Sequence, residues 1–382
     1  MYDVIVIGLG GLGSAAAYHL ARRGQRVLGL DAFAPGHTRG SSHGESRIIR
    51  QAYHEHPDYV PLLRRAYTLW EELQRAAGET LLTITGGLFA GRPESEPVAG
   101  ALESARRHGL PHEVLDAGAV RRRFPPLRPA PEEIAVYEPR AGVLFPERCI
   151  AAHLRLAGTA GAELRYDEPV RDWTPLDGGA AVEVRTRSGG RYRAARVVVT
   201  AGAWLGRLLG DLRLPLRPER NVVLWLRPRE RPEQFEPGRF PIFIWDRGAS
   251  GVYYGLPHVG RPGVKVGRHH SGAWCDPDTV DHTVRPEDEV PVRAFLASAV
   301  PALDGTLEDG AVCLYTNTPD GHFVVDRHPR VPAVLFAGGT SGHGFKLASV
   351  LGEVLAELAT TGRSTPAAAF LGAGRLLERP PG

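Results

Sequence analysis

A glycine-rich turn between an apolar run and a helical stretch constrains the fold of this chain more than any other feature. Gly8, Gly10 and Gly13 follow the apolar residues 4–7 and open a helical stretch over residues 11–23. In this context Gly8 permits a tight turn, Gly10 lets the backbone approach a pyrophosphate, and Gly13 lets the helix pack closely on the strand. The amino end of the helix then faces the negative charge. The spacing predicts a nucleotide-binding βαβ unit at the start of the chain.

The acidic residue after the second strand narrows the choice of nucleotide. Asp31 directly follows the predicted strand 27–30, where a carboxylate can accept hydrogen bonds from ribose hydroxyls. A carboxylate there repels a 2′-phosphate, which disfavours NADP. The fingerprint leaves both FAD and NAD open. Further glycine turns at 200–203 and 337–339 favour FAD, because its long nucleotide can contact distant pieces of one domain.

Composition excludes several classes of protein. The chain has 382 residues, 43% hydrophobic and 23% charged, which is enough for a large core or two domains. Its net charge of +3 is too small for a nucleic-acid footprint. Three cysteines cannot form a disulfide framework, no run of about 18 apolar residues occurs, and the first residues do not read as a targeting segment. We therefore expect a cytoplasmic protein that binds neither nucleic acid nor membrane.

Lysine and asparagine are scarce. Of 46 basic residues only Lys265 and Lys346 are lysines, and Asn221 and Asn317 are the only asparagines. A G+C-rich genome or selection at high temperature accounts for such a bias. A chain so poor in lysine nevertheless keeps it chiefly where arginine cannot substitute, since lysine is a compact point charge with a pKa that can shift. Both lysines are therefore candidate functional residues.

Periodic patterns place most of the remaining elements. Apolar residues at three- and four-residue steps predict an amphipathic helix over 58–77. Residues 181–199 alternate as strands, and residues 221–265 indicate strands broken by Pro and Gly, which suggests a sheet-rich second domain. An apolar strand at 334–337 and a glycine turn lead to a last amphipathic helix that Gly362 ends.

Four motifs, in this order along the chain, carry a resemblance to a known family. They are Gly8–Gly13, the loop Gly40–Arg50, the stretch Ala311–Tyr315 and the stretch Ser341–Lys346. With them the whole chain resembles the monomeric sarcosine oxidase family, which includes N-methyltryptophan oxidase and pipecolate oxidase within the glycine and D-amino-acid oxidase superfamily. Two departures are visible: Glu45-Ser46 replaces the commoner Asp-Thr, and Arg268 stands where an aromatic residue is usual. Arg268 lies beside the expected substrate region and leaves the exact substrate open.

The resemblance implies an α/β fold with two domains. A discontinuous Rossmann-like FAD-binding domain is expected to comprise residues 1–85, 141–215 and 311–382. A mostly antiparallel sheet in the substrate-binding domain is expected to comprise residues 86–140 and 216–310.

The resemblance also implies a cofactor site with FAD attached covalently to Cys313. Formation of a thioether requires a thiolate in a polar or cationic environment, whereas Cys149 and Cys275 fit the pattern of small buried hydrophobic residues. The other residues expected to bind the cofactor are Gly8, Gly10, Gly11, Gly13, Asp31, Ser41, Ser42, His43, Arg47, Val170, Gly202, Gly342, Gly344 and Lys346.

The expected substrate site combines cations with residues of one strand. The resemblance assigns Arg50 and Lys346 to the substrate carboxylate, and two cations from distant segments suit that anion. Alternation places Lys265 on the face opposite its two valine neighbours, and His269 follows on the same face. The resemblance puts Lys265 near flavin N5, where a fixed positive charge stabilises superoxide, and makes His269 a residue that positions the amine.

Two further residues and the absence of a metal complete these expectations. Tyr254 is expected to face the substrate and Arg47 the flavin, so the catalytic set is Lys265, His269, Arg47 and Tyr254. We expect no metal, because the pair His269-His270 lacks a Cys or carboxylate partner at ligand spacing.

The predicted function is oxidation of a secondary amino acid by a monomeric FAD enzyme. Sarcosine with O₂ and water would give glycine, formaldehyde and hydrogen peroxide. N-methylalanine, N-methyltryptophan, pipecolate and proline remain open as substrates. Two other possibilities also remain: a dehydrogenase that uses another electron acceptor, and a flavin-binding subunit without turnover.

Overall fold

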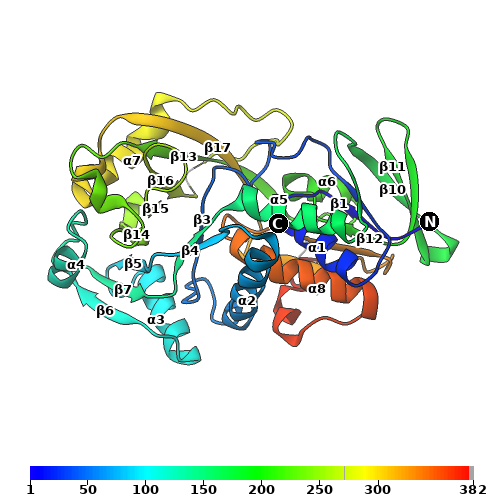
Figure 1. The fold of residues 1–382 in the computed structure, drawn as a ribbon, viewed down its shortest axis with the longest axis horizontal. Helices are drawn as coiled ribbons and strands as arrows, with labels where there is room; N and C mark the ends of the chain where they lie inside the picture. The colour runs from blue at the N-terminus through cyan, green and yellow to red at the C-terminus, as the bar shows by residue number, and fades with distance from the viewer. Residues whose placement is uncertain (271, 378–382) are drawn as a thin grey trace.

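The computed structural model describes residues 1–270 and 272–377, and the chain forms two lobes (Figure 1). Residues of both lobes line a cavity. The first lobe is built on a largely parallel eight-stranded sheet and contains the start of the chain. The second lobe is built on a mostly antiparallel eight-stranded sheet. This architecture confirms the predicted α/β fold with a Rossmann-like part and an antiparallel part.

The first sheet is organised around β1 (Tyr2–Ile7), which lies between two parallel neighbours. Its four carboxy-terminal residues are buried, as a strand covered on both faces requires. The chain leaves β1 at Gly8 and enters α1 (Gly11–Arg22), as the glycine spacing predicts. The strand order is β10-β11-β12-β1-β2-β9, with β19 on β12 and β18 on β19. The bounds are β2 (Val27–Leu30), β9 (Glu163–Arg165), β10 (Val170–Leu176), β11 (Ala181–Thr186), β12 (Arg191–Val199), β18 (Val324–Arg327) and β19 (Val334–Gly338).

Helices α1 and α8 (Ala348–Thr361) pack against each other in the core of the first lobe. Gly352 makes the contact close, since a Cβ there would lie 2.4 Å from the Cβ of Ala15. Lys346 lies in a 3₁₀ turn (Phe345–Leu347) just before α8. The chain packs closely before this turn, since a Cβ at Gly342 would lie 2.3 Å from Tyr315 and one at Gly344 would lie 2.4 Å from Thr340.

The second sheet has the order β17-β13-β16-β15-β14-β5-β7-β6. All its pairs are antiparallel except that of β5 with β14. Its outer face packs on α7 (Pro286–Ala299) through alternate residues such as Leu224, Val264 and Val266. The bounds are β5 (Gly87–Gly91), β6 (Glu113–Asp116), β7 (Ile134–Glu138), β13 (Arg217–Leu226), β14 (Ile242–Asp246), β15 (Val252–Leu256), β16 (Val264–His269) and β17 (Leu307–Asn317).

Strand β17 joins the two lobes and carries Cys313 (Figure 1). It pairs with β13 along most of its length, from Leu307 to Asn317. The domain boundary that the sequence suggested between residues 310 and 311 therefore falls inside one continuous strand of the second sheet. The reason is that pairing with β13 continues across that point, which no local signal in β17 reveals.

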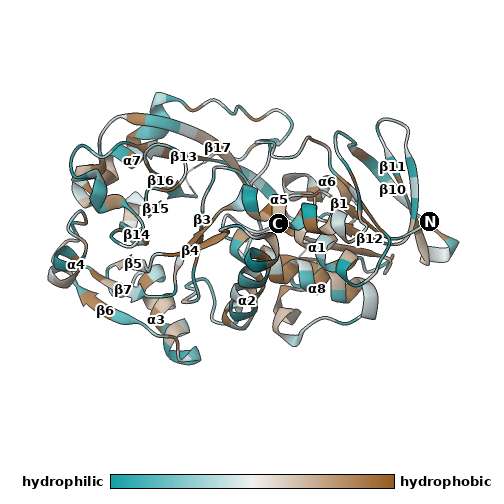
Figure 2. Cartoon of the chain, viewed as in Figure 1, coloured by the Kyte–Doolittle hydropathy of each residue, from teal (hydrophilic) through white to brown (hydrophobic). Residues whose placement is uncertain are grey.

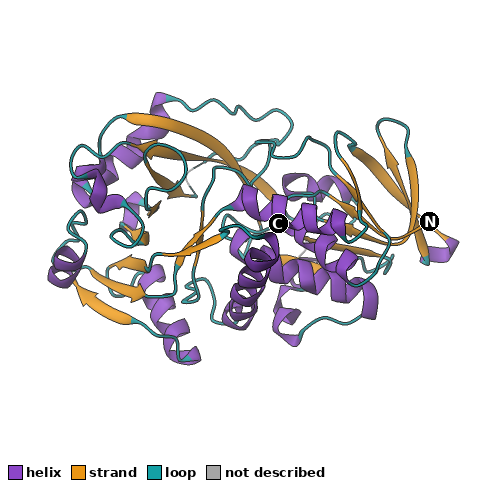
Figure 3. Ribbon diagram, viewed as in Figure 1, coloured by secondary structure: helices purple, strands orange, loops and turns teal. Residues whose placement is uncertain are grey.

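A small third sheet, β3-β8-β4, lies between the lobes (Figure 3). Its strand β3 (Arg47–Ile49) lies within the segment Gly40–Arg50 that the sequence indicated as a loop. The other bounds are β4 (Leu82–Ile84), β8 (Gly142–Leu144), α2 (Tyr59–Ala77), α3 (Glu96–His108), α4 (Ala117–Arg123), α5 (Pro146–Thr159), α6 (Leu205–Leu208) and α9 (Gly374–Leu377). The predicted helix 58–77 corresponds to α2 within one residue.

Hydrophobic residues concentrate along the inner strands and α8, while the outer hairpin β10–β11 is more hydrophilic (Figure 2). Among the described residues, no helix is both long and apolar enough to cross a membrane.

Candidate functional site

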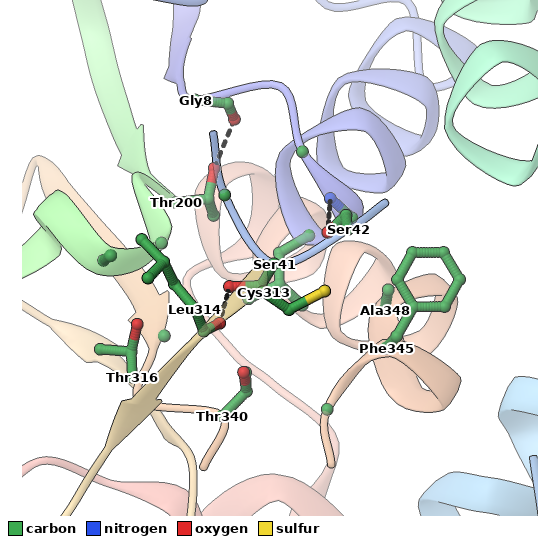
Figure 4. A pocket seen from close by; sticks show the side chains of 18 of the residues that line it. Gly8, Ser41, Ser42, Thr200, Cys313, Leu314, Thr316, Thr340, Phe345 and Ala348 are labelled. Carbon is green, nitrogen blue, oxygen red and sulfur yellow. Dashed lines mark hydrogen bonds between the residues drawn. The ribbon is translucent and has the colours of Figure 1, made fainter. Parts of the chain in front are cut away.

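A cavity of about 840 Å³ runs from the glycine turn after β1 to the inner face of the second sheet. Residues from both lobes line it, and their side chains converge on it in Figure 4. Its size is within the range of pockets that hold organic cofactors and substrates. All the predicted site residues except Gly13 and His43 are among those that line it.

The glycine turn leaves space for a ligand on one side and none on the other. A Cβ at Gly13 would lie 1.7 Å from the carbonyl oxygen of Gly8, so Gly13 serves helix–strand packing and does not face the cavity. Gly8 has a φ of +87°, which favours glycine. Ser42 accepts a hydrogen bond from the amide of Gly11 at 3.4 Å and so ties the second predicted motif to the first (Figure 4). Backbone amides at the start of α1 are thus close to the cavity.

Asp31 stands at the end of β2 as predicted, and its carboxylate is held in place by the backbone. One oxygen accepts from the amide of Leu9 at 2.7 Å and the other from that of Phe33 at 3.0 Å. Farther along the cavity lie Val170 and Gly202, with Trp204 and Phe33 forming an aromatic contact at 5.5 Å. The aromatic pair was not predicted from the sequence.

The sulfur of Cys313 points into the cavity from β17 (Figure 4). Nη2 of Arg47 lies 3.6 Å from Sγ, and the carbonyl oxygen of His43 lies 4.0 Å from it. Burial opposes ionisation, but Arg47, His43 and Lys265 outweigh it and lower the pKa of Cys313 to about 6. The thiolate is therefore the dominant form at neutral pH, which is the reactive form of cysteine.

The other two cysteines differ from Cys313. Cys149 is fully buried in the first core, and burial raises the pKa of its thiol, as expected for a small hydrophobic residue. Cys275 is only half-buried, so the prediction that it is a buried core residue is wrong. It lies in the segment between β16 and α7, and its amide donates to the carbonyl oxygen of Pro218 at 3.0 Å.

The loop that leads to Arg47 is fixed against β17. Ser41 donates a hydrogen bond to the carbonyl oxygen of Leu314, next to Cys313 (Figure 4). Arg47 donates through Nη2 to Ser41 O at 2.6 Å and through Nη1 to Ser46 O at 2.8 Å. These contacts hold the guanidinium beside the thiol although the two residues are 266 positions apart.

One face of the second sheet presents the predicted reactive residues. Residues that pair directly across antiparallel strands share a face, and Tyr254 pairs with Gly267, midway between Lys265 and His269. Asn221 pairs with Cys313 in the same way. The side-chain period of two thus places Lys265, Tyr254, His269 and Cys313 on the cavity side, while the valines beside Lys265 enter the core.

Lys265 is only 2% exposed, and its ammonium group is held by two carbonyls. Nζ donates to Gly44 O at 2.9 Å and to Ser46 O at 2.8 Å. Burial and the nearby guanidinium of Arg47 lower the pKa of Lys265 well below its usual value. Burial and Arg47 therefore disfavour the positively charged form of Lys265 that the sequence led us to expect. The hydrogen bonds to the two carbonyls partly offset this effect.

The two predicted carboxylate-binding cations lie close to each other, and an acidic residue already neutralises one of them. Nη2 of Arg50 lies 2.6 Å from each carboxylate oxygen of Glu55. Nζ of Lys346 donates to the carbonyl oxygen of His343 at 2.5 Å and lies 5.2 Å from the ring centroid of Tyr53. Burial, with the charge of Arg50, lowers the pKa of Lys346 to about 7.

Sequence reasoning missed Glu55 and the histidines around it. Burial opposes ionisation of Glu55, but Arg50 outweighs it and holds the pKa of this carboxyl well below its usual value. His54 Nε2 and His343 Nδ1 each lie 3.6 Å from Glu55 Oε1. Burial lowers the pKa of both histidines to about 3, so both are neutral. The sequence feature that could have indicated Glu55 is its position five residues after Arg50, which was predicted to bind the substrate.

His269 and two tyrosines line the part of the cavity beyond Cys313. Nδ1 of His269 lies 3.3 Å from the hydroxyl of Tyr315, a residue within a motif but without an assigned role. Burial and the neighbouring His270 lower the pKa of His269 well below its usual value. Burial, with the nearby Cys313, raises the pKa of Tyr254 to about 12. A neutral imidazole and neutral phenols therefore face the cavity.

The residues present fit FAD. The glycine turn excludes a Cβ at Gly13, which keeps helix and strand close, and Asp31 is fixed at the end of β2. The cavity then continues without interruption to an ionised thiol and a buried lysine. The glycine turn and Asp31 would hold the nucleotide part of FAD, and Cys313 and Lys265 line the part of the cavity that would receive its reactive ring. The part of the chain that is described contains no group of three or more His, Cys, Asp or Glu residues able to hold a metal ion.

A family model described as FAD dependent oxidoreductase matches residues 3–358. The chain belongs to this family of FAD-dependent oxidoreductases, as the glycine turn, Asp31 and the cavity led us to expect.

Within this family, the monomeric sarcosine oxidase of Streptomyces avermitilis is 47% identical over 99% of both chains. The N-methyl-L-tryptophan oxidase of Salmonella agona is 36% identical over 94% of both chains. These matches confirm the family resemblance found in the sequence motifs.

Solved structures share the architecture. NikD, an unusual amino acid oxidase essential for nikkomycin biosynthesis, superposes in its open form with a TM-score of 0.85, at 25% identity and over 97% of both chains. Glycine oxidase from Geobacillus kaustophilus has a TM-score of 0.82 at 23% identity, covering all of this chain and 99% of its own, and supports the fold alone.

Proposed function

We propose that this protein is a monomeric oxidase of secondary amino acids, with sarcosine as its principal substrate and FAD attached covalently to Cys313. One observation carries the proposal: the ionised thiol, the buried lysine Lys265 and the cation pair Arg50 and Lys346 line a single cavity. Family membership and 47% identity to a sarcosine oxidase support the substrate class. When bound, FAD accepts a hydride equivalent from the C–H beside the amine nitrogen and passes two electrons to O₂.

Arg50 and Lys346 would bind the substrate carboxylate. They are buried and close to each other, so a carboxylate between them forms charge-assisted hydrogen bonds away from water. Glu55 contacts Arg50 through Nη2, at 2.6 Å. A substrate carboxylate would therefore share this guanidinium with Glu55 or displace it.

His269 and Tyr254 would orient the amine. The pKa of His269 lies well below its usual value because the ring is buried, so it is a weak base. It serves better as a neutral hydrogen-bonding partner than as the acceptor of a full proton. The ring of Tyr315 beside it narrows this part of the cavity and helps to exclude water.

Lys265 would support the reaction with O₂. Its Nζ lies beside Arg47 and Cys313 on the cavity face of β16. Positive charge at this position favours electron transfer to oxygen in a site that excludes water. The carbonyls of Gly44 and Ser46 fix the position of the ammonium nitrogen.

Cys313 would form the covalent link. Arg47 supplies positive charge 3.6 Å from the sulfur, and the thiolate dominates at neutral pH because its pKa is about 6. We extend the proposal to a cytoplasmic location, and to an FAD domain and a substrate domain divided as the sequence suggested, except that the whole of β17 (Leu307–Asn317) belongs with the second sheet and the substrate domain.

The test is anaerobic mixing of the purified yellow protein with sarcosine, N-methylalanine, pipecolate, proline and N-methyltryptophan. Bleaching of the flavin absorbance by sarcosine at the highest rate, followed in air by O₂ consumption with stoichiometric H₂O₂, is the expected result. Bleaching without peroxide formation would instead identify a dehydrogenase with another acceptor. No bleaching by any secondary amino acid would leave the flavin-binding subunit as the correct alternative.

A further inference from the structure

Both asparagines of this asparagine-poor chain lie beside one buried acidic residue, Glu219 on β13. Nδ2 of Asn317 donates to Glu219 Oε2 at 2.6 Å, and Nδ2 of Asn221 lies 3.4 Å from the main-chain oxygen of Glu219. Glu219 is 3% exposed. A carboxylate at such depth requires donors on its oxygens, and here it has them.

The same carboxylate holds the turn that follows β16. His270 Nδ1 lies 3.0 Å from Glu219 Oε2, and the amide of Gly272 donates to Oε1 at 3.1 Å. His270 has a φ of +51°, an unfavourable left-handed conformation for a residue other than glycine. A Cβ at Gly272 would lie 1.3 Å from the carbonyl oxygen of Arg220, so the backbone at Gly272 packs directly on β13. Contacts to Glu219 therefore oppose relaxation of this turn.

The turn sets the position of His269, which immediately precedes it. The ring centroids of His269 and His270 are 4.0 Å apart, and Nδ1 of His269 lies 3.3 Å from the hydroxyl of Tyr315. Tyr315 is paired directly with Glu219 across β13 and β17. Glu219 thus contacts the residues that follow His269. It is also paired across the sheet with Tyr315, whose hydroxyl lies near the His269 ring.

We propose that Glu219 is a positioning residue of the substrate pocket, which holds the His270 turn and thereby keeps the ring of His269 against Tyr315. This inference rests on the proposed function, because it takes His269 as a contact of the substrate amine. Burial opposes ionisation of Glu219, but hydrogen bonds from His270 and Asn317 outweigh it and lower the pKa of Glu219. The residue is therefore an anion that can accept all three bonds at once.

The first test uses Glu219→Gln in the holoenzyme. The amide keeps the shape of the side chain but replaces one accepting oxygen with a donor, so it cannot satisfy Asn317, His270 and Gly272 together. We expect anaerobic flavin bleaching by sarcosine to slow about tenfold, with flavin content and the rate of reoxidation by O₂ unchanged. Glu133→Gln is the matched control, since Glu133 is a buried carboxylate of the same lobe that binds Trp245 and Arg247.

A double-mutant cycle separates positioning from general destabilisation. If Glu219 acts through His269, then Glu219→Gln slows bleaching no further in a His269→Ala background. Full additivity of the two effects, or a wild-type bleaching rate in Glu219→Gln, would overturn the inference. Should Glu219→Gln fail to fold, His270→Ala cuts the same link on the other side and is expected to show the same tenfold loss.

A readout without turnover keeps this inference separate from the proposed function. In protein with ¹⁵N-labelled histidine, the His269 signal is identified by its loss in His269→Ala. We expect this signal to shift in Glu219→Gln and to stay in place in Glu133→Gln. An unshifted His269 signal would overturn the positioning role even if secondary amino acids were not substrates. Absence of bleaching in the wild type would instead refute the proposed function alone.

Discussion

Glu55 holds Arg50 through both of its carboxylate oxygens, each 2.6 Å from the same guanidinium nitrogen. Arg50 is 1% exposed, so without Glu55 its charge would be buried and unpaired. The pair explains how a cation assigned to the substrate carboxylate is tolerated when no substrate is bound. Under the proposed function, Glu55 would compete with the substrate carboxylate for Arg50.

Removing this competitor should tighten anion binding and weaken the fold. In Glu55→Gln we expect at least tenfold stronger binding of a small carboxylate inhibitor such as propionate, measured by flavin difference spectra. We also expect a fall in the free energy of unfolding of about 3–5 kcal/mol, because Arg50 loses its buried partner. Glu71→Gln, which breaks the exposed pair with Arg140, is the control and should change neither quantity appreciably. Weaker propionate binding in Glu55→Gln would contradict the competition.

Substrate carboxylate binding should depend on the protonation of Lys346. Free protein loses this proton as pH rises through about 7, whereas a bound carboxylate favours the ammonium form. Affinity for propionate should therefore be greatest below pH 7 and fall by up to about tenfold per pH unit above it. Propionate has no amine to titrate, which isolates the protein group. Lys346→Arg should flatten the profile up to pH 9, and a sloping profile in that variant would place the titration on another group.

Loss of either cation should impair substrate use. Lys346→Ala removes one charge-assisted partner from a buried site, which costs roughly 2–5 kcal/mol of binding. We expect this as a rise in KM or a fall in kcat for every amino acid tested by O₂ consumption. An amine without a carboxylate should already be a poor substrate of the wild type and should be no worse in the variant. Unchanged constants would remove Lys346 from the substrate site.

The covalent flavin should depend on Cys313 and on its thiolate. Acid-precipitated wild-type protein should stay yellow, whereas Cys313→Ala should release its flavin and Cys149→Ala should behave as wild type. Incorporation of FAD into apoprotein should speed up as pH rises through about 6 and level off above, because the thiolate is the reactive form. A colourless wild-type pellet with free FAD in the supernatant would rule out the linkage.

Lys265 should serve the reaction with oxygen more than the reaction with substrate. Lys265→Met keeps length but removes the ammonium group held by Gly44 and Ser46. A loss of about 4 kcal/mol of charge stabilisation slows reoxidation roughly a thousandfold. Stopped-flow measurement of the two half-reactions should show this, with anaerobic reduction affected much less and partial rescue by Lys265→Arg. Wild-type reoxidation in Lys265→Met would make the lysine structural and favour the dehydrogenase.

The sequence by itself determined features that depend on local spacing. The turn at Gly8, the strand that ends before Asp31 and helix α2 follow from the steric freedom of glycine and from hydrophobic period. The side-chain period of a strand also placed Lys265 and His269 on one face, and both line the cavity. Motif resemblance then suggested roles for residues that no local pattern could assign.

Only the tertiary structure decided which distant groups meet. Arg47 reaches Cys313 across 266 positions, and the resulting charge lowers the pKa of the thiol. Strand β17 is part of the second sheet because β13 pairs with it through position 310, where the sequence suggested a domain boundary. Glu55 is only five positions from Arg50, but that spacing alone did not show that burial would pair the two side chains. Such contacts depend on burial and on packing between separate elements, and neither is encoded in a window of neighbouring residues.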